Sequence, residues 1–328
     1  MTDVIRQAPP QGVRVEGLGK VFRGRNGRTV RAVHDVNFTI AAGACLGIAG
    51  ESGSGKSTVA RMLVGLETPT TGDVWVAGQQ LAESPSAAER RAHARRVQMV
   101  FQDPYSSLDP RQSIGASLDE VQRVHFDRTS AQRRARSLQL LDAVGLDEGY
   151  AKALPRTMSG GQRQRLVIAR ALSVEPSVLV LDEAVSALDV STQAQILNLL
   201  KDLQEEFSLT YIFISHDLSV IRQVSDEVLV LYLGEVMENS AAESLFTQPQ
   251  HPYTQLLLNS VPHPGMVLER RAARSMPNDE GCRFASRCEL VHDRCAHDPP
   301  QFETRGGTCV RCWLADSSTD PTTSETHD

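Results

Sequence analysis

The fold of this chain is decided by one stretch, Gly50-Glu51-Ser52-Gly53-Ser54-Gly55-Lys56-Ser57. The apolar run Cys45–Ala49 before it predicts a buried strand, and residues 58–66 after it follow a helical pattern. Glycines at such a turn let backbone N–H groups surround phosphate oxygens, and the helix adds its positive N-terminal end. Lys56 supplies a charge for the outer phosphates, and Ser57 is placed to bind Mg2+. The stretch therefore predicts a phosphate-binding loop.

Composition sets outer bounds on the function. The chain has 328 residues, of which 41% are hydrophobic, so it can bury a substantial core. No run of eighteen apolar residues occurs, and the N-terminal residues have no apolar signal-peptide core. A formal net charge of -6 argues against nucleic acid as a partner. We therefore expect a cytoplasmic protein that reaches a membrane only through partners.

Patterning predicts an α/β protein with several parts. Residues 1–12 and 315–328 are polar and aperiodic, which is typical of disordered tails. Short β-like segments over residues 13–40 predict an N-terminal antiparallel subdomain, with a turn at 25–28. Residues 106–165 are mostly helical in pattern and predict an inserted helical subdomain. Strand-like runs then alternate with helical stretches, which predicts a mostly parallel sheet.

Two carboxylates end one of these buried strands. Asp182 and Glu183 follow the apolar run 178–181, at the sheet edge where open α/β sheets bind ligands. We expect Asp182 to hold Mg2+ and Glu183 to polarise an attacking water as a general base.

The sequence Met158-Ser159-Gly160-Gly161-Gln162 resembles the signature loop of the ATP-binding cassette (ABC) ATPases, with Met158 where Leu is usual. Ser159 is placed to cap a helix whose glycine-lined N-terminus takes an anion. The resemblance implies a P-loop, RecA-like sheet, with the cassette spanning 13–245. It also implies that this loop reaches the nucleotide of a partner subunit, so that two subunits enclose two ATP molecules.

Further residues match this family in chain order. Gln102 matches the glutamine that touches Mg2+ and the attacking water, and His216 the switch histidine at the γ-phosphate. Asp189 ends a loop that crosses the dimer seam, and Phe22 resembles the aromatic that stacks on adenine. Ala184 departs from the pattern, because relatives commonly carry proline there. The implied nucleotide contacts are Phe22, Gly50, Glu51, Ser52, Gly53, Ser54, Gly55, Lys56, Ser57, Thr58, Ser159, Gly160, Gly161, Gln162 and Asp189.

The C-terminal part resembles one branch of the family, the ATPases of oligopeptide, dipeptide and nickel importers. The segment His251-Pro252-Tyr253 matches the start of their extension, predicted here over 246–314. The resemblance implies an energy-coupling ATPase, peripheral on the cytoplasmic face of the cell membrane, with peptide as the expected cargo and nickel as the alternative. Implied partners are two permeases, a second ATPase subunit, identical or different, and indirectly an extracytoplasmic binding protein. A protein acting on ribosomes or DNA is a weaker alternative, because the chain has one phosphate loop and no long coiled coil.

Five of the six cysteines lie in that extension, and four of them have the spacing C-x5-C-x6-C-x16-C, at Cys282, Cys288, Cys295 and Cys312. Clustered thiols in a cytoplasmic protein argue for metal, because disulfides do not persist there. An all-sulfur set suits a [4Fe-4S] cluster or Zn2+. These four cysteines include no C-x2-C pair among themselves, and this spacing, together with the resemblance to importer ATPases, favours the cluster. Cys309 is a substitute ligand in this interpretation, and Cys45 belongs to the core.

Overall fold

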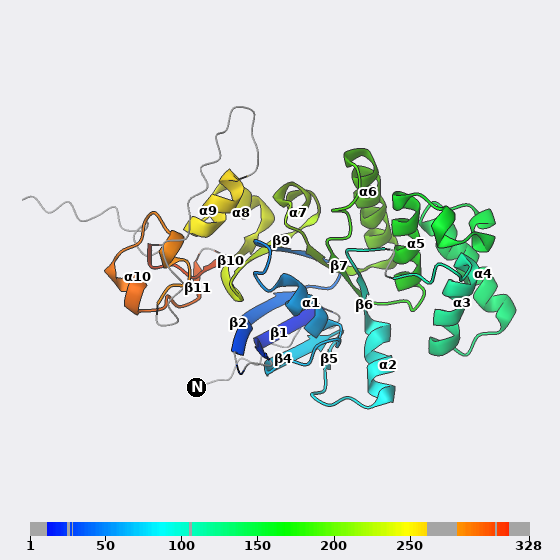
Figure 1. Cartoon of the computed structure of the whole chain (residues 1–328), viewed down its shortest axis with the longest axis horizontal. Helices are drawn as coiled ribbons and strands as arrows, with labels where there is room; N and C mark the ends of the chain where they lie inside the picture. Colours follow the sequence, from blue (N-terminus) through cyan, green and yellow to red (C-terminus); the bar gives the residue numbers. More distant parts are fainter. Residues whose placement is uncertain are drawn as a thin grey trace, which may run out of the picture.

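The computed structural model describes residues 12–24, 27, 29–104, 107–260, 281–305 and 307–314. The predicted disordered tails lie outside these residues except for Gly12, and so does most of the predicted turn at 25–28. Figure 1 shows helices α3 and α4 at one end of the molecule and α8, α9 and α10 at the other, with the sheets between them.

The N-terminal subdomain is an antiparallel sheet with the strand order β2-β1-β4-β5 in the described chain. Alternate residues of β1, such as Val13 and Val15, are buried, as expected for a sheet with one face on the core. Gly17 has a φ of 59°, and the register of β1 against β2 shifts beside it, so glycine permits a bulge at this point. The strands are β1 (Val13–Arg23), β2 (Thr29–Ile40), β4 (Thr71–Val76) and β5 (Gln79–Gln80).

The second sheet has the order β11-β12-β10-β9-β3-β8-β7-β6 over the described residues. Strand β3 pairs in parallel with β8 and β9, and β7 pairs in parallel with β6 and β8. The remaining pairings, β9 with β10 and β12 with both its neighbours, are antiparallel. Its strands are β3 (Cys45–Ala49), β6 (Val97–Val100), β7 (Val178–Asp182), β8 (Thr210–Ile214), β9 (Glu227–Tyr232), β10 (Glu235–Ala241), β11 (Glu303–Arg305) and β12 (Thr308–Val310).

Other elements pack on both faces of this sheet, so most residues of its parallel strands are buried. All five residues of β7 are buried, with Leu179 and Leu181 in one apolar cluster and Val178 and Val180 in the other. The helices are α1 (Lys56–Leu63), α2 (Ala87–Arg96), α3 (Ile114–His125), α4 (Ser130–Ala143), α5 (Gly160–Leu172), α6 (Val190–Phe207), α7 (Leu218–Val224), α8 (Ala242–Thr247), α9 (Pro252–Asn259) and α10 (Asp293–His297). Short 3-10 turns are η1 (Glu148–Lys152), η2 (Pro155–Thr157) and η3 (Ala285–Arg287).

The predicted fold class is confirmed: an antiparallel β subdomain, a parallel-rich sheet and an inserted helical region. The strands and helices predicted around the phosphate loop lie within a few residues of their observed bounds. The extension also contributes strands to the main sheet, which the sequence patterns do not indicate. Its strand β12 pairs with β10 and so adds β11 and β12 to the edge of the main sheet.

Candidate functional site

The phosphate loop joins β3 to α1, as the sequence predicts. Gly50, Gly53 and Gly55 have φ values of 148°, 81° and 106°, in the region that favours glycine. A Cβ on Gly50 would lie 2.3 Å from the Leu231 carbonyl oxygen, so neither the conformation nor the space admits a side chain. Helix α1 begins at Lys56, with its unpaired first-turn N–H groups directed into the loop. This geometry makes a cradle for phosphate oxygens.

Lys56 lies folded inside the loop. Its Nζ atom donates to the carbonyl oxygens of Gly50 and Glu51 at 2.7 and 2.8 Å, and it is 6% exposed. Burial lowers the pKa of Lys56, while the carboxylates of Glu183, Asp182 and Glu51 oppose this shift. The ammonium group is therefore held by two backbone carbonyl oxygens, which are neutral. Phosphate oxygens, which are charged, can replace these carbonyls as its partners.

Ser57 and Asp182 place two oxygen ligands side by side. The Ser57 hydroxyl donates to Asp182 Oδ1 at 3.2 Å, across the gap from α1 to the end of β7. Burial raises the pKa of Asp182, and the Ser57 hydrogen bond opposes this. A buried carboxylate beside a hydroxyl is the donor set that Mg2+ prefers, so these residues fit the expected ion.

Glu183 lies at the centre of a hydrogen-bonded group of three residues. Its Oε2 accepts from Gln102 Nε2 at 2.8 Å, and its Oε1 lies 3.2 Å from His216 Nδ1. Glu183 has a φ of 50°, a strained conformation for a residue with a side chain. Its N–H still donates to the Ile214 carbonyl oxygen at 2.9 Å. The backbone thus turns immediately after its last hydrogen bond to β8. Side chains that follow the ends of β6, β7 and β8 meet at this point.

These residues share one hollow of about 570 Å³. It is lined by Ala32, Ser52, Gly53, Gly55, Lys56, Ser57, Thr58, Gln102, Glu183 and His216. Ala32 was not predicted from sequence, since nothing but the fold brings β2 beside the loop. Of the predicted nucleotide contacts, Gly50, Glu51 and Ser54 belong to the loop but do not line the hollow. Phe22 does not line it either and lies exposed near the end of β1.

The signature residues also lie away from this hollow. Ser159 caps α5 through a reciprocal pair of hydrogen bonds with Gln162, at 3.3 and 2.9 Å. A Cβ on Gly161 would lie 2.5 Å from the Thr192 methyl carbon, so glycine permits close packing against α6. Asp189 caps α6 through the Thr192 N–H at 2.9 Å. The N-termini of α5 and α6 therefore lie together at a surface separate from the hollow beside the phosphate loop.

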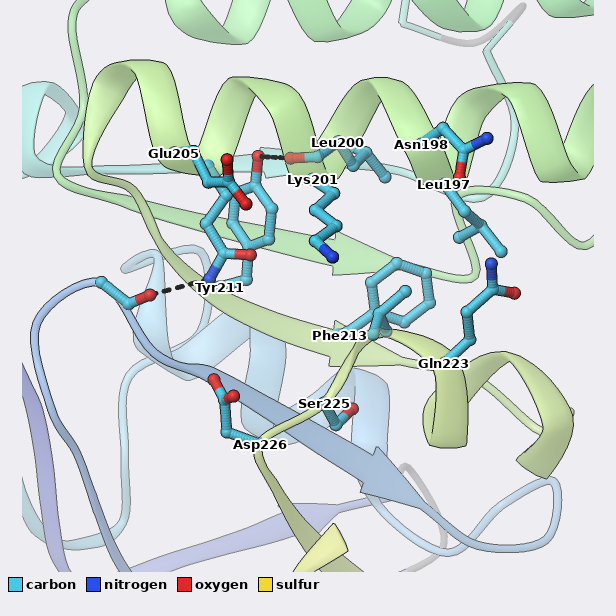
Figure 2. A pocket seen from close by; sticks show the side chains of 13 residues that line it. Leu197, Asn198, Leu200, Lys201, Glu205, Tyr211, Phe213, Gln223, Ser225 and Asp226 are labelled. Atoms are coloured by element: carbon cyan, nitrogen blue, oxygen red, sulfur yellow. Dashed lines mark hydrogen bonds between the residues drawn. The ribbon is translucent and has the colours of Figure 1, made fainter. Parts of the chain in front are cut away.

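A different hollow, of about 470 Å³, lies near the amino ends of strands β3 and β9 (Figure 2). Gly43 and Asp226, which line it, precede strands β3 and β9, whereas the phosphate loop follows β3. Tyr211 donates to the Leu200 carbonyl oxygen and Gln204 Nε2 to that of Gly43, both at 2.8 Å. None of the predicted site residues lines this hollow.

The four spaced cysteines gather around one small apolar pocket of the extension. Cys282, Cys288, Cys295 and Cys312 line it together with aromatic and aliphatic side chains such as Phe284. Burial, reinforced by the other three thiols, raises the pKa of Cys282 to about 11. The pocket measures about 10 Å³. This apolar site favours the neutral thiols unless a cation compensates the thiolate charge.

The described residues contain no group of three or more His, Cys, Asp or Glu side chains arranged to hold a metal ion. The geometry therefore does not by itself support the iron-sulfur or zinc interpretation. Cys309 lies in β12, where its sulfur is 3.0 Å from the Thr304 hydroxyl, and it does not line the pocket. Cys45 is buried in β3 as expected.

Two contacts between the phosphate loop and the extension could not be predicted from sequence patterns. Arg287 and Tyr253, both from the extension, bind Glu51. Arg287 is 236 positions from Glu51, and no periodicity or motif connects two residues so far apart.

The fold and the hollow define a P-loop nucleotide hydrolase. Residues 33–186 match the ABC transporter family model, and residues 237–295 match the oligopeptide/dipeptide transporter C-terminal region. The chain is 41% identical to the dipeptide transport ATP-binding protein DppF of Escherichia coli over 90% of each chain. It is 44% identical to the di/tripeptide transport ATP-binding protein DppF of Pseudomonas aeruginosa, over 88% of this chain and 91% of the relative.

Among solved structures, a dimeric ATP-binding cassette in a post-hydrolysis state with ADP and Pi matches with a TM-score of 0.63 and 30% identity. The match covers 70% of this chain and 98% of the cassette. The chain belongs to the ATP-binding cassette family and is an ATPase. Within the described residues, no helix is both long and apolar enough to cross a membrane.

Proposed function

We propose that this chain is the ATP-hydrolysing subunit of an ABC importer for dipeptides or oligopeptides, acting on separate permease subunits at the cytoplasmic face of the membrane. The observation that carries the proposal is the coexistence of two features. One is the acid, amide and histidine group around Glu183 beside the phosphate loop. The other is an extension that matches the oligopeptide/dipeptide transporter C-terminal region. Nickel import is the alternative cargo for the same ATPase.

Each residue of the hollow has a role in this proposal. Lys56 leaves the Gly50 and Glu51 carbonyls and binds the outer phosphates, while the loop N–H groups hold the phosphate oxygens. Glu183 accepts a proton from the attacking water, and Gln102 and His216 fix its two oxygens. His216 is well exposed, so its free edge is available to the γ-phosphate.

Ser57, Asp182 and Gln102 would hold the Mg2+ ion expected for this family, which neutralises phosphate charge when bound. Asp182 fits this role because it is a buried carboxylate that accepts a hydrogen bond from the Ser57 hydroxyl.

The site is completed by a second ATPase subunit, identical or different. Ser159, Gly160, Gly161 and Gln162 present the α5 N-terminus on a surface separate from the hollow, so they serve the nucleotide of the partner. Asp189 rigidly caps the neighbouring helix at the same surface. Phe22 would stack on adenine from its exposed position on β1.

We further propose that Cys282, Cys288, Cys295 and Cys312 hold a [4Fe-4S] cluster, with Zn2+ as the alternative. The proposal starts from the spacing of these cysteines in the sequence, and their common place around one apolar pocket is compatible with it, although their side chains are not arranged as a metal site in the described residues. Iron and zinc content of anaerobically purified protein tests this. Zinc without iron refutes the cluster, and neither metal refutes both.

Reconstitution tests the importer assignment. The full chain is co-expressed with two permeases and a second ATPase of a candidate importer, and the purified complex is placed in liposomes. We expect ATPase activity that rises with binding protein loaded with dipeptide and uptake of labelled dipeptide. Stimulation by nickel chelates alone would favour the alternative, and co-sedimentation with ribosomes without a membrane complex would refute the importer.

A further inference from the structure

The loop between Cys282 and Cys288 lies against the phosphate loop. Arg287 Nη1 and Nη2 each donate to a carboxylate oxygen of Glu51 at 2.7 Å, a two-pronged ion pair. The backbone N–H of Glu51 donates to the Tyr253 hydroxyl at 3.0 Å. Glu51 does not line the nucleotide hollow, so its side chain serves the extension and not the phosphates.

A second arginine of the same loop reaches the phosphate loop through one intermediate turn. Arg283 Nε pairs with Glu235 Oε1 at 2.8 Å, and its Nη1 donates to the Leu233 carbonyl oxygen at 3.0 Å. The next residue, Gly234, donates its N–H to the Ser54 carbonyl oxygen at 2.9 Å. A Cβ on Gly234 would lie 2.6 Å from the Ala32 carbonyl oxygen, so this turn packs tightly beside the hollow.

Aromatic packing fixes the loop that carries both arginines. Phe284, which lies between them, is 2% exposed. Its ring centroid is 5.4 Å from those of Tyr232 and Tyr253, which are 4.6 Å from each other. Cys282 and Cys288 are the first and last residues of this segment, and both line the cysteine pocket. The arginines are therefore held by a rigid, packed unit and do not project from a free loop.

We propose that residues 282–288 form a brace that holds the phosphate loop in its nucleotide-binding shape, with Arg287 as a positioning residue acting through Glu51. The extension thereby sets the affinity of the cassette for ATP, in addition to its role in any importer. Whatever fixes the thiols of Cys282 and Cys288 also fixes the two arginines between them. The brace itself does not depend on which metal the cysteines hold, nor on the cargo.

A double-mutant cycle on the full chain tests the brace. The variants are Arg287→Ala, Glu51→Ala and both together, and the measurement is the Kd of a fluorescent ATP analogue with Mg2+. A partly exposed, two-pronged pair predicts about three- to fivefold weaker binding for each single variant. Because one contact is removed in all three proteins, the double variant should bind no more weakly than the weaker single variant.

Two further proteins keep the test specific. Arg294→Ala removes another arginine of the extension, six residues beyond the brace, which pairs with Asp298 and lies over Trp313. It should bind the analogue as the unaltered chain does. Arg287→Lys keeps the charge but loses the two-pronged geometry, so its affinity should lie between those of the unaltered chain and of Arg287→Ala.

Trp313 fluorescence shows whether the extension stays folded in the Arg287 and Glu51 variants, and metal content shows it in every variant, including Arg294→Ala, which removes the cation over Trp313. Intact fluorescence and metal content in Arg287→Ala with weakened binding support the brace. Binding unchanged in Arg287→Ala, or singles whose effects multiply in the double variant, would overturn it. Weakened binding accompanied by loss of the extension's fold, with no recovery in Arg287→Lys, would overturn it also. None of these outcomes bears on peptide import, which is tested separately in liposomes.

Discussion

Replacing Glu183 with glutamine should remove the general base while the site keeps its shape. Gln102 Nε2 donates to Glu183 Oε2 at 2.8 Å, and the amide oxygen of a glutamine at position 183 can accept this bond equally well. His216 Nδ1, 3.2 Å from Oε1, can accept from the new amide nitrogen in the appropriate tautomer. Both contacts survive, and only charge and basicity are lost.

The size of the effect follows from that change. General-base catalysis contributes about 10²- to 10⁴-fold to a rate. At 1.36 kcal/mol per factor of ten, this corresponds to about 3–5 kcal/mol of barrier. Glu183 is shielded, with its side chain 20% exposed, and both of its oxygens are bound, so we expect a loss of about 10³-fold. Binding of MgATP should change by less than about twofold, because the phosphate cradle is untouched.

The assay is phosphate release by the purified chain, with ATP-analogue binding and the size of the ATP-bound species measured in parallel. We expect Glu183→Gln to bind ATP and accumulate as a dimer. The control is Glu205→Gln, the same change at an exposed residue of α6 that lines the opposite hollow. Retention of more than a tenth of the hydrolysis would refute the role of Glu183 as base. Loss of ATP binding would show that Glu183 holds the nucleotide.

Three further predictions follow from the geometry. Ser159→Arg should hydrolyse no ATP and still bind it, and mixing it with a Lys56→Ala subunit should restore hydrolysis at one composite site; no recovery on mixing contradicts a shared site. Gly50→Ala should lose ATP binding, because its Cβ would lie 2.3 Å from the Leu231 carbonyl oxygen, whereas Gly53, with open space around it, should tolerate alanine better; equal binding by both variants contradicts this. Burial lowers the pKa of His93 in the folded protein. Below about pH 6.5 the unfolded chain therefore binds a proton at His93 that the folded protein does not, and the free energy of unfolding decreases as the pH falls. In urea unfolding at pH 7.5 and 5.5, His93→Gln should lose less stability than the unaltered protein, and an equal loss contradicts the assignment.

Local sequence predicted much of the cassette because its signals are local. A phosphate loop needs glycines at fixed positions between a strand and a helix, and the observed φ values of Gly50, Gly53 and Gly55 match that need. The capping pair Ser159 and Gln162 is equally local, since both bonds form within one turn. Buried parallel strands such as β7 are uninterrupted apolar runs and are recognisable for that reason.

Contacts between distant segments were not predictable in this way. The strained turn at Glu183 appears only where β7 ends beside β8, and β12 joins β10 through backbone pairing that any sequence of suitable polarity can make. The strands of the extension were therefore not predictable from local sequence, although they continue the main sheet.

The sequence by itself determined that this chain is a nucleotide-hydrolysing cassette, since strand, glycine turn, helix and terminal carboxylates are encoded within short stretches. Only the tertiary structure decided which surfaces meet. It placed Gln102 and His216 on the two oxygens of Glu183, gathered four cysteines around one pocket and set Arg287 on Glu51. These arrangements depend on packing between elements far apart in the chain, for which no local propensity exists.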